Sequence, residues 1–324
     1  MSRLALVTDS TSGLSGPLSV ERAITVVPLH VIFGEQDLSE GIDISAFEVA
    51  ERLRKEPRVS TSRPSPKAFL QVYERLAEQG VQEILSVHLS AQLSGTCEAA
   101  TLAARDAPVP VRVVDSGVVG AGLGLAVLAA ARVLDPPAGA SADSGDAGAV
   151  GGSGAGGGSG AGGGSEDLIG AAAALVRAHA AATVTLFYVH TLEFLRRGGR
   201  IGAASAFLGG ALGVKPLLEL TDGHIEPVEK LRTQGRALAR LHDIAVQRAV
   251  ASPAPMRVVV HHVDATARAE DFAAKLAASL RESEALAGAP EVVPLPAVLA
   301  AHVGPGALGA MLTPDTPDSL TPRP

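Results

Sequence analysis

The sequence predicts an α/β protein built from two α/β domains. We expect a mostly parallel sheet with flanking helices in the N-terminal domain and a mixed sheet in the C-terminal domain. Strand-like apolar runs alternate with helix-like segments along the chain, which is typical of sheets covered by helices. The 324 residues suit two domains of ordinary size, and a hydrophobic fraction of 47% can fill a sizeable core.

In the first part of the chain, short apolar runs predict strands at residues 4–8, 25–32, 83–89 and 111–115. The first and last of these end in Asp-Ser, as buried parallel strands often do. Helices are predicted at residues 46–55 and 66–79. The second of them begins after Ser65 with Pro66 and ends at Gly80, which are ordinary start and stop signals. An Ala-rich helix is expected after Thr96.

Residues 136–165 interrupt this pattern, because 13 of the 36 glycines fall there. Such a segment buries too little apolar surface to offset the entropy of ordering it, so we expect a flexible insert. Helical runs are predicted on both sides, at residues 123–134 and 166–182. The predicted organisation is an N-terminal domain at 1–135, the insert at 136–165, a C-terminal domain at 166–313 and a disordered tail at 314–324.

The second part of the chain resumes the alternation of strands and helices. Asp222-Gly223 between two apolar runs is a strong hairpin signal. The expected strands are residues 183–189, 217–221, 225–231, 257–262, 291–294 and 307–312, and the expected helices are residues 191–197, 203–213, 235–251 and 265–282.

Composition excludes several classes of function. Lys and Arg number 27 against 34 Asp and Glu, and this net charge of −7 argues against a nucleic-acid binder. One cysteine, Cys97, rules out a disulfide framework and a thiolate metal cluster, and no metal or cofactor is assigned. The longest uncharged apolar stretch, residues 117–131, is too short to span a bilayer. We expect a cytoplasmic protein without a transmembrane segment, for which transient contact with a membrane surface stays open.

Hydroxyl side chains follow several of the predicted strands, in the segments 8–12, 60–62, 90–96 and 115–116. Ligands of open α/β sheets bind outside the carboxyl ends of the strands. Ser94-Gly95-Thr96 precedes a helix, so its hydroxyls and the first backbone N–H groups can hold an anion. Plain helix capping is the alternative for any single cluster, but several clusters at equivalent strand ends favour a shared polar site.

Two further residues are candidates for a polar site. Arg200 follows Gly198-Gly199, which permit close backbone approach, and an anionic carboxylate is a suitable partner for it. His302 precedes a glycine turn. That turn formally matches GxGxxG, but too little chain follows for a dinucleotide site. No GxSxG elbow occurs, yet Ser94 paired with His302 leaves a serine-dependent esterase or acyl-transfer enzyme as an alternative function.

Taken together, the motifs resemble those of the DegV family of bacterial fatty-acid-binding proteins, and the match covers nearly all of residues 1–313. The motifs that carry the resemblance are Leu6-Val7-Thr8-Asp9-Ser10, Ser60-Thr61-Ser62-Arg63-Pro64-Ser65-Pro66, Leu93-Ser94-Gly95-Thr96, Thr191-Leu192-Glu193-Phe194-Leu195 with Gly198-Gly199-Arg200-Ile201, Leu212-Gly213-Val214-Lys215-Pro216, and His302-Val303-Gly304-Pro305-Gly306-Ala307-Leu308-Gly309. Arg63 departs from the family pattern, which often has Gln there, and the insert is longer than usual.

The resemblance implies a carrier rather than an enzyme. A long-chain fatty acid such as palmitate would lie between the domains, with its chain in an aliphatic tunnel. No residue is assigned a catalytic role. The residues implied for the carboxylate are Thr61, Ser62, Ser94, Gly95 and Thr96, with Arg200 and His302 orienting them. The resemblance also implies a fatty-acid kinase as a possible partner, for which Arg232 resembles a docking residue.

Overall fold

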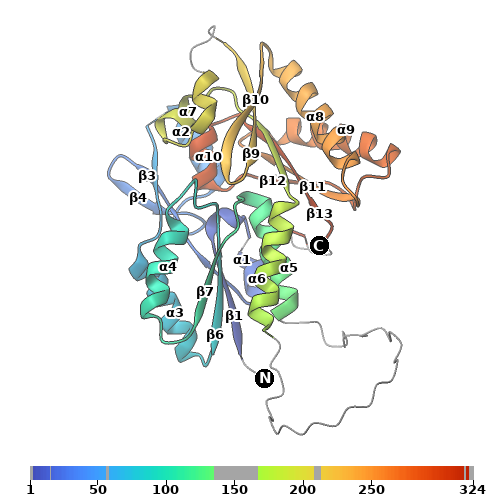
Figure 1. Cartoon of the computed structure of the whole chain (residues 1–324). Helices are drawn as coiled ribbons and strands as arrows, with labels where there is room; N and C mark the ends of the chain where they lie inside the picture. Colours follow the sequence, from blue (N-terminus) through green and yellow to red (C-terminus); the bar gives the residue numbers. More distant parts are fainter. Residues whose placement is uncertain are drawn as a thin grey trace, which may run out of the picture.

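The computed structural model describes residues 3–14, 16–55, 58–134, 167–207, 213–316 and 319–320. It confirms the predicted α/β class, with a parallel sheet in the N-terminal part and a mixed sheet in the C-terminal part (Figure 1). The expected insert at 136–165 lies outside the described residues, as does Leu212 of the quoted motifs. The domain boundaries stay a prediction.

The N-terminal part is built on a four-stranded parallel sheet of order β2-β1-β6-β7. Helices α3 and α4 cover one face, and α5 and α6 cover the other (Figure 1). Helix α5 is buried along most of its length because it is apolar on all sides. The elements are β1 (Leu4–Asp9), η1 (Ser10–Ser12), α1 (Gly16–Glu21), β2 (Ile24–Val27), α3 (Pro66–Glu78), β6 (Glu83–His88), α4 (Thr96–Asp106), β7 (Val111–Asp115), α5 (Gly120–Leu134) and α6 (Leu168–Ala181).

A small antiparallel sheet of order β4-β3-β5 lies between the two parts of the chain. Its elements, with the neighbouring helix, are β3 (His30–Phe33), β4 (Gln36–Ser39), α2 (Ala46–Lys55) and β5 (Ser60–Ser62). The single strand predicted at 25–32 is wrong, because β2 and β3 belong to different sheets. Pro28 separates them, since proline has no N–H to donate to a ladder.

The C-terminal part forms a six-stranded sheet of order β10-β9-β8-β13-β11-β12, in which only the β11–β12 pair of the described strands is parallel. Helices α8 and α9 pack on one face, against residues such as Leu186 and Val260. Alternate residues, such as Phe187 and Met311, face the N-terminal part. The elements are β8 (Val184–Tyr188), α7 (Glu193–Arg197), η2 (Gly202–Phe207), β9 (Lys215–Thr221), β10 (His224–Leu231), α8 (Gln234–Val250), β11 (Met256–His262), α9 (Thr266–Glu282), β12 (Glu291–Pro294), α10 (Ala297–Val303) and β13 (Leu308–Pro314).

Three local features of this part differ in how well the sequence predicts them. The hairpin at Asp222-Gly223 is confirmed, with both residues at positive φ as a tight hairpin requires. Helix α10 was not predicted. Pro296 before it and Gly304 after it at positive φ are the signals that mark its ends. In place of the helix expected at 203–213 there is a 3-10 helix at η2, and residues 208–212 lie outside the described part.

The described residues of the predicted disordered tail at 314–324, namely 314–316 and 319–320, are packed against the rest of the chain. Strand β13 runs through Pro314, and both Ser319 Oγ and Leu320 N donate hydrogen bonds to Glu291. The Leu320 side chain is buried beside Gly124 of α5. An apolar side chain and a nearby carboxylate therefore hold this segment despite its prolines. Residues 317–318 and 321–324 are outside the described ranges.

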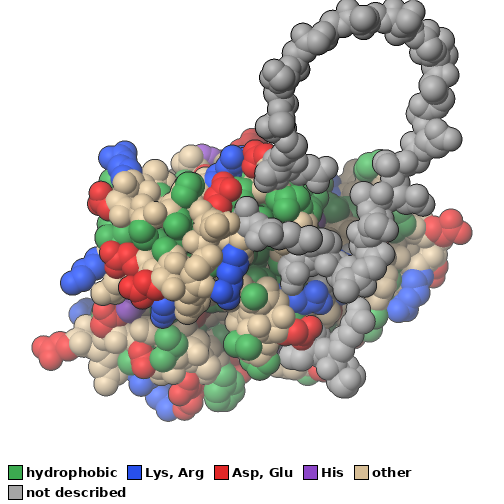
Figure 2. Space-filling model, turned by 90° about the horizontal axis from the view of Figure 1, so that it is seen from below, with side chains coloured by type: hydrophobic (Ala, Val, Ile, Leu, Met, Phe, Trp, Pro, Cys, Tyr) green, Lys and Arg blue, Asp and Glu red, His purple; other side chains and the backbone are tan. Residues whose placement is uncertain are grey.

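None of the helices in the described ranges has the length and apolar character needed to cross a bilayer. Acidic and basic side chains are intermixed on the face shown in Figure 2.

We expect Leu320→Ala to lower the free energy of unfolding by about 2–3 kcal/mol, because it removes a buried side chain that joins the two parts of the chain. Urea denaturation followed by circular dichroism measures this. Leu102→Ala is the matched control, since Leu102 is 40% exposed and its loss should cost about 0.5 kcal/mol or less. An equal effect of the two substitutions would contradict a docked tail.

Candidate functional site

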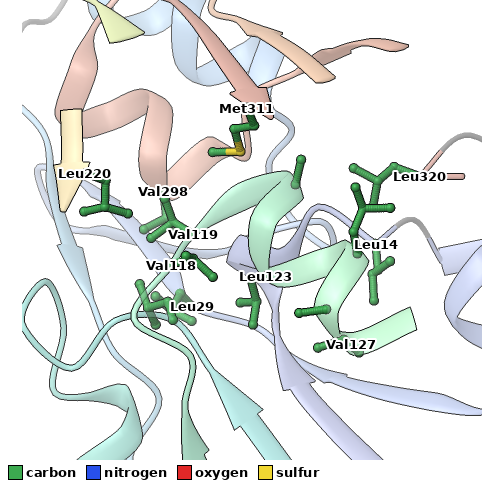
Figure 3. Packing of buried hydrophobic residues seen from close by; sticks show 14 of the residues in the cluster. Leu14, Leu29, Val118, Val119, Leu123, Val127, Leu220, Val298, Met311 and Leu320 are labelled. Carbon is green, nitrogen blue, oxygen red and sulfur yellow. The ribbon is translucent and has the colours of Figure 1, made fainter. Parts of the chain in front are cut away.

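A cavity of about 360 Å³ lies between the six-stranded sheet and the N-terminal part. This volume is within the range of small-molecule binding sites. Its walls are mostly aliphatic and include Leu29, Val119, Leu220, Val298 and Met311, whose side chains are labelled in Figure 3. The remaining apolar lining comes from Leu89, Leu93, Leu186, Phe187, Leu195, Ile225, Val263, Leu295, Leu299, Val303, Ala307 and Leu308.

The cavity has a polar region, and this region contains a side-chain contact between the N-terminal and C-terminal parts of the chain. Thr61 Oγ1 of β5 lies 2.9 Å from His302 Nε2 of α10. The His302 ring lies against Gly198, where any Cβ would collide with it, so a glycine is required there. A second, small hollow of about 10 Å³ is also lined by Thr61 and His302 and is large enough for one water molecule. Thr61 and His302 therefore form a wall of the cavity.

The second group of polar atoms comes from the start of α4. Ser94 Oγ lies 2.8 Å from Thr96 Oγ1, so the Ser94 hydroxyl is not engaged in capping. Gly95 is the N-cap residue and makes no side-chain hydrogen bond to the helix. Ser94 and Gly95 line the cavity. The first N–H groups of an eleven-residue helix and two hydroxyls thus lie together, which is a favourable place for an anion.

Two arginines complete the polar end. Arg200 Nε donates to the Leu93 carbonyl at 2.9 Å, and Arg200 Nη1 donates to the Gly198 carbonyl at 2.6 Å. Arg200 therefore ties the loop that carries Ser94 to the C-terminal part. Arg63, which lines the cavity close to Gly95, makes an ion pair with Glu98 of α4 at 3.2 Å.

Burial, together with the nearby positive charge of Arg200, lowers the pKa of His302 to about 4. At neutral pH the imidazole is therefore uncharged. A neutral ring has one N–H and one acceptor nitrogen, so it can donate to Thr61 Oγ1 and leave the threonine O–H to point at a ligand.

The other hydroxyl clusters serve the framework instead of the cavity. Asp9, which is fully buried, accepts hydrogen bonds from Thr11 N, Thr11 Oγ1, His88 Nδ1 and Leu89 N. Asp115 Oδ1 accepts from Ala91 N and Gly117 N. Ser90 Oγ donates to the Gly223 carbonyl at the tip of the β9–β10 hairpin. These bonds hold the 90–95 loop from both sides.

The structure brings most of the candidate residues together. Those that line the cavity are Thr61, Ser62, Ser94, Gly95, Arg200 and His302. Thr96 is fully buried beside Ser94. Arg232 is exposed at the end of β10 and is not part of the cavity wall. Their roles toward a ligand stay predictions.

Some residues of the cavity, such as His261 and Met311, belong to none of the motifs. They lie on one face of the six-stranded sheet with Gly309, and the three become neighbours only through strand register. The Arg63–Glu98 ion pair likewise joins two separate segments. A period of two along β11 and β13 marks alternate residues as a face, but it does not say which face borders a cavity.

The geometry is unlike that of a serine hydrolase. In the described structure Ser94 Oγ contacts Thr96, while His302 contacts Thr61. A nucleophile needs its base within hydrogen-bonding distance. Among the described residues no group of three or more His, Cys, Asp or Glu side chains is arranged to hold a metal ion.

Comparison with known proteins decides the family. A family model described as "Uncharacterised protein, DegV family" matches residues 3–143 and 165–315. The chain belongs to the DegV family. A DegV domain-containing protein of Streptomyces coelicolor is 44% identical over 314 residues, which cover 97% of this chain and 99% of that protein.

Solved structures of DegV proteins share the fold. A DegV family protein from Thermus thermophilus, described by its fatty acid binding, is 32% identical with a TM-score of 0.76, over 96% of this chain and 99% of that one. DegV of Bacillus subtilis, described as a fatty acid binding protein, is 26% identical with a TM-score of 0.76, over 97% of this chain and 100% of that one.

The lowered pKa of His302 predicts a pH-dependent contribution to stability. The unfolded chain binds a proton at this histidine below about pH 6.5, whereas the folded chain binds it only near pH 4. The contribution is complete above pH 6.5 and falls as the pH drops to 4, by about 1.4 kcal/mol per unit at most. We expect His302→Gln to lose less stability than the wild type between pH 7 and pH 5.

Urea denaturation at several pH values measures this difference. The comparison must be between variant and wild type, because other groups titrate in the same window. Burial lowers the pKa of His179 and His261 to about 4, and it raises the pKa of Glu40 to about 7, which acts in the opposite direction. Parallel curves for wild type and His302→Gln would contradict a buried neutral imidazole.

Proposed function

We propose that this chain binds a long-chain fatty acid such as palmitate in the cavity between the two parts of the chain. The observation that carries the proposal is a mostly aliphatic cavity in which two arginines, Arg63 and Arg200, lie beside the loop that carries Ser94. A fatty acid has the same division into an apolar chain and one anionic group. Two DegV relatives of similar structure are themselves described as fatty acid binding.

The apolar walls supply the affinity. Burying about 15 methylenes at ~0.8 kcal/mol each is worth on the order of 12 kcal/mol before the costs of ordering and association. An aliphatic wall can follow a flexible acyl chain without imposing the planar geometry of an aromatic surface. The head-group contacts therefore determine orientation more than they determine affinity.

The carboxylate is proposed to lie among Thr61, Ser62, Ser94, Gly95 and Thr96. A carboxylate that leaves water without partners costs several kcal/mol, so donors must converge on it. Hydroxyls and the uncapped N-terminus of α4 supply such donors. Arg200 holds the Ser94 loop in place and adds positive charge, and neutral His302 orients the Thr61 hydroxyl.

We further propose that the chain is a cytoplasmic carrier without a cofactor, and that it presents the acid to a fatty-acid kinase. The carboxylate end of the cavity is bordered by Arg63, which is half exposed, so this end is closer to solvent than the aliphatic walls. The exposed Arg232 is a candidate contact for the kinase. Because Ser94 Oγ contacts Thr96 while His302 contacts Thr61, an esterase that pairs Ser94 with His302 is disfavoured.

Lipid extraction of the purified protein, followed by mass spectrometry, tests the binding proposal. We expect a stoichiometric long-chain fatty acid, and we expect Thr61→Ala to weaken binding of added palmitate by about tenfold through loss of one charge-assisted hydrogen bond. Thr101→Ala is the control, since Thr101 is an exposed threonine of α4 away from the cavity. Protein that neither carries nor binds a fatty acid would refute the function.

The kinase proposal has a separate test. We expect Arg232→Glu to reduce acyl-phosphate formation by an added fatty-acid kinase while palmitate binding stays unchanged, because Arg232 lies outside the cavity wall. Arg281→Glu reverses another exposed charge, at the end of α9, and serves as the control. Equal phosphorylation of both variants would remove Arg232 from the docking surface.

A further inference from the structure

One flexible side chain, that of Met311, is the last cavity-lining member of a cross-strand row in the six-stranded sheet. The polar end adjoins the β9–β10 edge of the six-stranded sheet, since Arg200 precedes η2, which packs on β10. From that edge, Leu220, Thr185 and Met311 follow each other in one cross-strand row over β9, β8 and β13. All three line the cavity, whereas Val259, the next member of the row, does not. The row of lining residues therefore ends at Met311.

Met311 reaches from the sheet to the helix that covers it. A Cβ built on Gly120, at the start of α5, would lie 3.1 Å from Met311 Cε and 3.0 Å from His261 Nε2. Gly120 also has φ +56, a conformation that favours glycine. His261 is fixed in turn, because its Nε2 accepts a hydrogen bond from Ala121 N at 3.0 Å. The Met311 thioether thus spans the space between the six-stranded sheet and α5, beside the His261 imidazole, which the hydrogen bond from Ala121 holds in place.

We infer that Met311 is the end wall for the methyl terminus of the ligand, and that it determines which acyl chain lengths the cavity accepts. This inference rests on the proposed fatty-acid function. Figure 3 labels Leu220, Val298 and Met311, which all line the cavity, and Thr185 separates Leu220 from Met311 along the cross-strand row.

The chemistry of methionine suits an adjustable wall. The side chain is unbranched and has three rotatable bonds, so its end can move without moving the backbone. Its neighbours cannot move as easily. Gly309, on the adjacent cross-strand row, has no side chain, so no side chain covers the sheet between Phe187 and His261. A longer acyl chain therefore meets the Met311 thioether before it meets any other flexible group on this face of the sheet.

The test compares Met311→Ala with Met256→Ala in the full chain. Met256 is also a buried methionine, but it faces α8 and α9 in the other cluster, so it controls for the loss of a core methionine. Wild type and variants are expressed together with the same lipid supply, and the bound fatty acids are extracted and sorted by length. Binding of added saturated acids of 14 to 20 carbons is then measured on delipidated protein.

We expect Met311→Ala to move the preferred length by about two carbons and to strengthen binding of the longer acids about tenfold, since each buried methylene adds ~0.8 kcal/mol. Met256→Ala should keep the wild-type profile. If Met311→Ala does not fold, Met311→Val removes less volume and should shift the profile in the same direction. A wild type that binds fatty acids while both Met311 variants keep its length profile would overturn the inference. A wild type without fatty acid would instead overturn the proposed function.

Discussion

The buried carboxylate of Asp9 is the constraint on which the site depends. A fully buried charge is costly unless donors surround it, and here it accepts four hydrogen bonds from Thr11, His88 and Leu89. These donors lie at the carboxyl ends of two adjacent parallel strands. Satisfying the charge therefore fixes where β1 and β6 end. The loop that follows β6 carries Ser94. The hydrogen bonds to Asp9 therefore position the proposed anion site, although Asp9 itself does not line the cavity.

The same corner of the molecule connects the N-terminal part to α10. Ser10, next to Asp9, donates to Glu40 at 2.5 Å, and the other Glu40 oxygen accepts from Val298 N at 2.8 Å. Burial raises the pKa of Glu40 to about 7, and the neighbouring Asp9 charge acts in the same direction. Because α10 carries both Val298 and His302, this contact orients the helix whose far end contacts Thr61. The framework and the polar end are thus linked through one short helix.

Fold class was predictable because it depends on local patterns: apolar runs of strand length, helix start and stop signals, and the Asp-Gly hairpin all act within a few residues. The division of residues 25–32 into two strands was not predictable, since only the pairing partners reveal that β2 and β3 join different sheets. Thr61, Ser94, Arg200 and His302 were identified from motifs, and their convergence follows from long-range docking. Met311 and His261 had no motif, because strand register and the position of α5 make them neighbours.

The polar end exists only when the two parts of the chain are docked. Thr61 and Ser94 belong to the N-terminal part, whereas Arg200 and His302 come from the C-terminal part, and the bonds between them run through Leu93 and Gly223 as well. A ligand that contacts both groups binds the docked state better than any separated state. Binding and docking must then stabilise each other, since a ligand shifts an equilibrium by its difference in affinity for the two states. An occupied cavity would therefore hold the two parts together more firmly than their direct contacts alone.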